Sequence, residues 1–155
     1  MAELSWKDRF WTDWESNRRL TVEVGRAFPA EALWATPVPA MRSFGKLLEE
    51  IAGIEHALVA GVAHDRWSAA LPELPHADPW PAFAAVREET SRDWAGISVA
   101  RLAEVTPDPF GWGLPPQSMA DRLQYALENE IHHRAQGYVY LRLLGIEPPP
   151  FWKRS

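Results

Sequence analysis

The chain has 155 residues, 46% hydrophobic and 24% charged, a balance typical of a soluble globular protein. Its formal net charge of −5 and the lack of a basic run argue against a nucleic-acid partner, because binding to the phosphate backbone relies on clustered Lys and Arg. No apolar stretch approaches the roughly 18 residues that a membrane span needs, and the N-terminus lacks the pattern of a secretory signal. We therefore expect a cytoplasmic protein whose partner is a small molecule or another protein.

Cysteine is absent, which excludes disulfides and thiolate metal sites. Any metal must be held by nitrogen and oxygen ligands, and any thiol chemistry must use an external thiol.

Hydrophobic positions at spacings of three and four predict four long helices, with prolines or glycines at their ends. Asp78 is the expected N-cap of the third helix, with Pro79 at its first position. Gly145 and the prolines after it end the last helix. The expected helical ranges are 5–27, 41–61, 78–97 and 117–144.

Long loops at 29–40, 63–79 and 98–116 connect these helices. The alternation of Val99, Leu102 and Val105 is compatible with a short strand in the last loop. No repeat or linker divides the chain, so residues 1–155 are expected to form one all-α domain, a four-helix bundle with long crossover loops.

The most informative run is the segment 129–136, NEIHHRAQ, inside the last predicted helix. Adjacent residues on a helix are about 100° apart, so its two histidines face different sides. The hydrophobic stripe of this helix places Asn129, His133 and Tyr140 on the inward side and turns His132 away. Tyr140 is predicted either to donate a hydrogen bond to a substrate or to pack in the core with a satisfied hydroxyl.

On the second helix, Glu50 follows Leu47 by three residues and precedes Ile54 by four, so it is also predicted to face inward. An unpaired buried carboxylate is costly, which makes this position unusual. Glu50, Asn129 and His133 can therefore converge. Two interpretations stay open: the three side chains hold a divalent cation, or they form a metal-free network around a buried Glu50–His133 ion pair.

The remaining histidines, His56, His64 and His76, show no ligand spacing and are predicted to be solvated. Glu55 is predicted to face a neighbouring helix, with Arg134 or Arg142 as its ion-pair partner.

Two segments resemble the signatures of the DinB/YfiT-like proteins. The C-terminal signature covers EIHHRAQ at 130–136, YVYLRLLG at 138–145 and Pro148-Pro149, and the second-helix signature covers SFGKLLEEIAGIE at 43–55. With the helix order between them, the resemblance extends over nearly the whole chain.

The resemblance implies a four-helix bundle with up-down-down-up topology, frequently a homodimer. Family members typically bind a divalent metal through one histidine of the second helix and two of the last helix, four residues apart. Some act as metal-dependent hydrolases or transfer thiols such as bacillithiol or mycothiol onto electrophiles, and some are associated with stress or DNA damage.

Carried over by position, the implied ligand set is Glu50, Asn129 and His133, of which only His133 keeps the family's histidine. His132 matches a motif histidine that is not usually a ligand, and Ala135 stands where the motif has glycine.

Two functions follow. In the first, a divalent metal (Zn, Ni, Mn or Fe) held by Glu50, Asn129 and His133 activates water or an external thiol against a small electrophilic substrate, and Glu50 and His133 carry the catalysis. Glu50 acts as general base in this scheme where it is not a ligand. In the second, the chain is a metal-free binding or scaffold protein of a stress or damage response. Direct DNA binding is disfavoured by the acidic balance.

Overall fold

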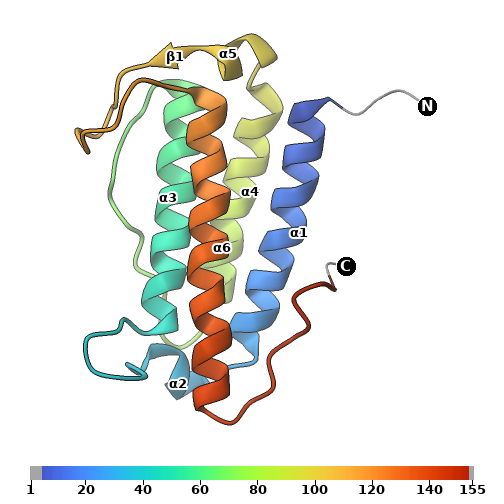
Figure 1. Ribbon diagram of the computed structural model, residues 1–155, viewed down its shortest axis with the longest axis vertical. Helices are drawn as coiled ribbons and strands as arrows, with labels where there is room; N and C mark the ends of the chain where they lie inside the picture. The colour runs from blue at the N-terminus through green and yellow to red at the C-terminus, as the bar shows by residue number, and fades with distance from the viewer. Residues whose placement is uncertain (1–4, 154–155) are drawn as a thin grey trace. The chain divides into compact units, whose positions relative to one another are not determined.

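The computed structural model describes residues 5–153 and confirms the predicted all-α fold (Figure 1). The described residues contain the following elements: α1 Trp6–Arg26, α2 Ala30–Trp34, α3 Phe44–His64, α4 Trp80–Gly96, α5 Val99–Ala103, β1 Val105–Thr106, β2 Gln117–Ser118 and α6 Met119–Leu143.

Local capping signals set the ends of the long helices. The Ser5 hydroxyl caps α1 by accepting the backbone N–H of Asp8 at 3.2 Å. Gly145, just past α6, has φ +74°, a left-handed conformation that glycine adopts without a steric penalty. The prediction for α4 was wrong by one residue: Pro79 is the N-cap, and the Asp78 carboxylate accepts the N–H of Trp80 at 3.2 Å.

Two loop predictions were wrong. The segment 29–40 contains the short helix α2, which buries Leu33. The proposed strand at 99–105 is instead the helix α5, where the Ser98 hydroxyl accepts the N–H of Arg101 at 3.0 Å and Leu102 becomes buried. A single capped turn buries Leu102 while keeping its neighbours solvated, and extended structure begins only at Val105.

Contacts within the chain divide it into two compact units. One unit comprises 48–129. The other, as described, comprises 5–47 together with 130–153. The single domain and the up-down-down-up topology remain predictions.

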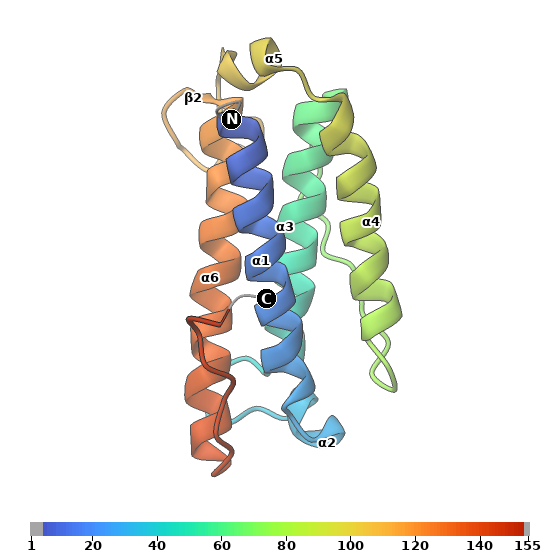
Figure 2. The same cartoon turned by 90° about the vertical axis from the view of Figure 1, so that its right-hand side faces the viewer.

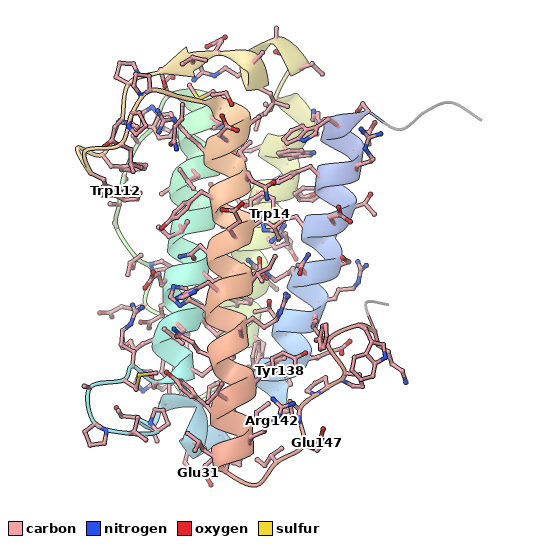
Figure 3. The ribbon with its side chains drawn as sticks, viewed as in Figure 1. Trp14, Glu31, Trp112, Tyr138, Arg142 and Glu147 are labelled. Carbon is pink, nitrogen blue, oxygen red and sulfur yellow. The ribbon has the colours of Figure 1, made fainter. Side chains whose placement is uncertain are left out.

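In the unit made of 5–47 and 130–153, α1 lies beside the second half of α6, as both views show (Figures 1 and 2). Glu130 is fully buried and accepts hydrogen bonds from Arg18 Nε at 2.9 Å, Arg18 Nη2 at 3.2 Å and Trp14 Nε1 at 3.1 Å. Figure 3 labels Trp14, whose indole points from α1 toward α6. A buried ion pair thus joins the two helices, and a buried charge requires this kind of compensation.

One turn further along α6, Arg134 donates to the backbone carbonyl oxygen of Asn17 at 2.9 Å and to Asn17 Oδ1 at 2.8 Å. Both side chains are buried. The same arginine approaches the Thr21 hydroxyl at 3.4 Å. The α1–α6 contact is therefore largely polar, and its geometry is set by hydrogen bonds as well as by packing.

In the unit 48–129, α3 lies beside α4, and the buried pair Glu55–Arg87 joins them at 3.0 Å (Figure 2). The loop after α3 returns along it and covers small residues spaced eight apart. A Cβ on Gly53 would meet Leu71 at 2.5 Å, and one on Gly61 would meet Trp67 at 2.1 Å. Only glycine lets the loop approach the helix this closely.

Within the described range 5–153, no helix combines the length and apolar character needed to cross a membrane.

Candidate functional site

Two of the three predicted site residues are in contact within the unit 48–129. Asn129 Nδ2 lies 3.4 Å from Glu50 Oε1, a long hydrogen bond in a partly buried setting. Asn129 is buried, whereas Glu50 is half-buried. The other amide atom, Asn129 Oδ1, is buried and accepts no hydrogen bond from residues 5–153. Two oxygen-bearing groups therefore lie together, and one buried acceptor is available to a ligand.

The third predicted residue, His133, belongs to the unit made of 5–47 and 130–153. It is buried at 4% exposure, while His132 is exposed, so the prediction that the two rings face different sides is confirmed. Asn129 and His133 are four residues apart on the continuous helix α6, as the helical stripe required. Convergence of His133 with Glu50 remains a prediction.

The inward position predicted for Glu50 is correct only in part, because its neighbour Glu49 is the more deeply buried carboxylate of this turn. Glu49 is 5% exposed, and its Oε1 accepts the backbone N–H of Leu74 at 3.0 Å. The loop that returns along α3 buries this side of the helix. The prediction considered only the stripe of α3 that faces other helices, and so it missed Glu49. The spacing of Gly53 and Gly61 was the available signal that a loop packs closely against another side of this helix.

The structure gives Glu55 a partner that the sequence did not suggest: its Oε2 accepts a hydrogen bond from Arg87 Nη2 of α4 at 3.0 Å. Pairing of Glu55 with Arg134 or Arg142 stays a prediction. Periodicity places a residue on a helix face but does not identify which neighbouring helix supplies its counter-ion.

The outer histidines are peripheral, as predicted. His76 is exposed, and His64 Nε2 lies 2.9 Å from Asp93 Oδ1 on the surface of the unit 48–129. His56 lies 3.6 Å from Glu89, with both side chains well exposed. These are surface contacts between α3 and α4, not a ligand cluster.

Tyr140 is buried at 3% exposure, and its hydroxyl has no hydrogen-bond partner among residues 5–153. The predicted core position is confirmed, but the predicted satisfied hydroxyl is wrong. Burial raises the pKa of the Tyr140 phenol, although the nearby charge of Arg42 opposes this.

Across residues 5–153, no group of three or more His, Cys, Asp or Glu side chains is arranged to hold a metal ion. A cation bound near Glu50 would therefore need the Asn129 amide oxygen among its ligands. The buried acceptor Oδ1 fits that role, although an amide oxygen is a weaker ligand for transition metals than imidazole or carboxylate.

Comparison with known proteins places the fold. The family model described as the DinB family matches residues 4–154. The chain is also similar to the crystal structure of a DinB-like protein, YjoA from Bacillus subtilis, with a TM-score of 0.76 and 20% sequence identity over 94% of this chain and 98% of that one. A search of curated proteins gives no match.

The structural similarity at this identity concerns the fold alone, whereas the family model spans nearly the entire sequence. Glu50 and the buried His133 lie in the segments that carried the sequence resemblance, and Asn129 directly precedes the C-terminal one. The chain belongs to the DinB family.

Proposed function

We propose that this chain is a metal-dependent enzyme, a hydrolase or a transferase of a low-molecular-weight thiol, that acts on a small electrophilic molecule. The observation that carries the proposal is the buried Asn129 Oδ1, which has no hydrogen-bond partner within residues 5–153 while Nδ2 of the same amide contacts the Glu50 carboxylate. An unsatisfied buried acceptor costs about 1–3 kcal/mol, and a bound cation would recover that cost. Membership of the DinB family adds support.

Glu50, Asn129 and His133 are the residues that would hold the cation, which we propose to be Zn, Ni, Mn or Fe. Carboxylate oxygen, amide oxygen and imidazole nitrogen together suit a divalent ion of this group. Such an ion supplies Lewis-acid activation of water or of a thiol. Since the chain has no cysteine, the thiol would come from solution.

Glu50 has a second role in this proposal, as the group that accepts a proton from the attacking water or thiol. It is half-buried, so solvent and substrate can reach it, and the Asn129 amide restrains its orientation. A carboxylate held within hydrogen-bond reach of the nucleophile acts as a general base.

The test is elemental analysis of untagged protein, purified without an affinity metal, for the wild type and three variants. Wild-type protein should hold about one equivalent of a divalent metal. His133→Ala should lose it and Glu50→Gln should lower it. The matched control His132→Ala, which removes the exposed neighbour on the same helix, should keep it.

Circular dichroism of each variant checks that α6 remains folded. Unchanged metal content in folded His133→Ala protein would reject the proposed ligand set.

A second candidate is a metal-free binding or scaffold protein of a stress or damage response. The contact from Asn129 Nδ2 to Glu50 favours it, because the pair is partly satisfied without an ion. Protein that holds no metal, even after soaking in Zn, Ni, Mn and Fe, would favour this candidate over the enzyme.

We also propose that the chain acts in the cytoplasm, as one domain, in the form of a homodimer. Exposed apolar side chains on the last two turns of α6 and beyond support the dimer: Val139 is 55% exposed, Leu143 61% and Leu144 48%. Light scattering coupled to size-exclusion chromatography tests it; a monomeric mass at micromolar concentration would reject it.

A further inference from the structure

A second site lies wholly within the unit 48–129, between the β1–β2 loop, α3 and the start of α6. A cavity of about 140 Å³ opens there, lined by Leu58, Phe110, Trp112, Leu114, Gln117, Arg122 and Tyr125. Its volume is close to that of an engineered apolar cavity of about 150 Å³ that binds benzene. The space therefore suits one small ring.

The walls of this cavity are mainly aromatic. Phe110 and Trp112 stack, with ring centroids 4.5 Å apart and planes 17° apart, and Trp112 meets Tyr125 edge-on at 6.4 Å. Trp112, labelled in Figure 3 on the loop, is 47% exposed, and Tyr125 is 44% exposed. Large aromatic side chains that line a cavity and stay partly exposed to solvent indicate a binding site for an apolar ligand.

Arg122 gives the same cavity a buried positive charge. The residue is 3% exposed, and its Nη2 donates to the carbonyl oxygens of Thr106 and Pro107, both at 2.8 Å. The guanidinium also lies 5.8 Å from the centre of the Trp67 ring. The carbonyl contacts explain why this loop needs an arginine, but they neutralise none of its charge.

One donor of Arg122 has no acceptor within residues 5–153. Its Nε is fully buried with no hydrogen-bond partner there, and no carboxylate of these residues forms an ion pair with the guanidinium. Of the three other arginines that are buried within residues 5–153, Arg18 and Arg87 each pair with a glutamate, and Arg134 donates to Asn17. A buried, uncompensated guanidinium is costly and is strongly stabilised by a carboxylate, which it binds in a planar, two-pronged geometry.

The loop that carries the aromatic rings is held in shape by its own contacts. The Asp108 carboxylate accepts the N–H of Phe110 at 2.9 Å and the N–H of Leu114 at 3.3 Å. Gly111 and Gly113 have φ of +71° and +78°, in the left-handed region that residues with a side chain rarely adopt. The rings are thus positioned before any ligand arrives.

From these observations we infer that the cavity binds a small aromatic monocarboxylate, with its ring among Phe110, Trp112 and Tyr125 and its carboxylate on Arg122. The inference stands independently of the proposed metal chemistry, because none of the lining residues is a proposed ligand.

Isothermal titration calorimetry with benzoate tests the inference on the full chain. A nine-atom ligand of ordinary efficiency should bind with a Kd of about 1 mM or tighter. Benzamide, a neutral molecule of the same shape, should bind at least about 10-fold more weakly, because it cannot form the charge-assisted bonds. Acetate should also bind more weakly, because it has no ring.

Variants locate the site. Arg122→Gln should weaken benzoate binding by at least about 10-fold, and Trp112→Ala by about 2- to 10-fold. Arg101→Gln is the matched control, since Arg101 of α5 also donates to a backbone carbonyl oxygen, that of Val62 in α3 at 2.9 Å, but does not line the cavity. It should leave the affinity within about 2-fold.

Comparison of benzoate with benzamide needs no variant, so the test survives a poorly folded Arg122→Gln protein. Equal binding of benzoate and benzamide, or no benzoate binding at about 10 mM, would overturn the inference. Equal binding of acetate and benzoate would overturn the aromatic part of it.

Discussion

The buried ion pair between α1 and α6 makes a quantitative prediction. Glu130→Gln keeps the size of the side chain but removes the charge that Arg18 needs, and it replaces one acceptor oxygen with a donor. Glu130 is fully buried and accepts hydrogen bonds from the Arg18 guanidinium and the Trp14 indole. Breaking a buried pair by neutralising one partner costs about 3–5 kcal/mol.

That loss is a large share of the 5–15 kcal/mol typical of a domain. With a urea m-value of about 2 kcal/mol/M, the unfolding midpoint should fall by about 1.5–2.5 M. Urea titration followed by circular dichroism at 222 nm measures it.

Two controls separate the pair from a general effect on α6. Glu128→Gln changes an exposed glutamate half a turn away and should alter the free energy of unfolding by less than about 0.5 kcal/mol. The double variant Arg18→Met with Glu130→Leu removes both charges and should recover much of the loss, because well-packed apolar residues replace a buried pair at little cost. A loss below about 1 kcal/mol for Glu130→Gln would refute the reasoning.

Three further outcomes are expected. The raised pKa of Tyr140 means that the contribution of its neutral phenol to stability is complete below the ordinary pKa near 10 and is lost as the pH rises through the raised value. Ultraviolet titration at 295 nm should show a late-titrating tyrosine in the wild type that is missing in Tyr140→Phe protein. The same titration curve at high pH for both proteins would contradict the buried hydroxyl. Gly61→Ala should destabilise by about 1–3 kcal/mol in urea unfolding because its Cβ would overlap Trp67, whereas Gly96→Ala, whose Cβ meets nothing within 4 Å, should not. The hydrogen bond from the Phe110 N–H is the largest cause that holds the pKa of the exposed Asp108 carboxyl below its usual range. The loop should therefore stay ordered above about pH 4 and lose order as the pH falls through the lowered pKa. An ordinary Asp108 pKa in carbon-detected NMR would rule this out.

The sequence by itself determined the four long helices, because their stripes and end signals are local. Ser5, Pro79 and Gly145 act within a few residues of their own positions, and the predicted ends lie within about three residues of the observed ones. The inward turn of Asn129 and His133 and the outward turn of His132 follow from the rotation of about 100° per residue and were also predictable.

Only the tertiary structure decided which partners those faces meet. Arg87 of α4 pairs with Glu55, and the loop that covers Gly53 and Gly61 buries Glu49 more deeply than Glu50. The aromatic cavity around Arg122 likewise depends on a loop whose path no periodicity describes. The physical reason is that helix formation is governed by contacts three or four residues apart, whereas counter-ions, loop paths and cavities are fixed by residues far apart in the chain.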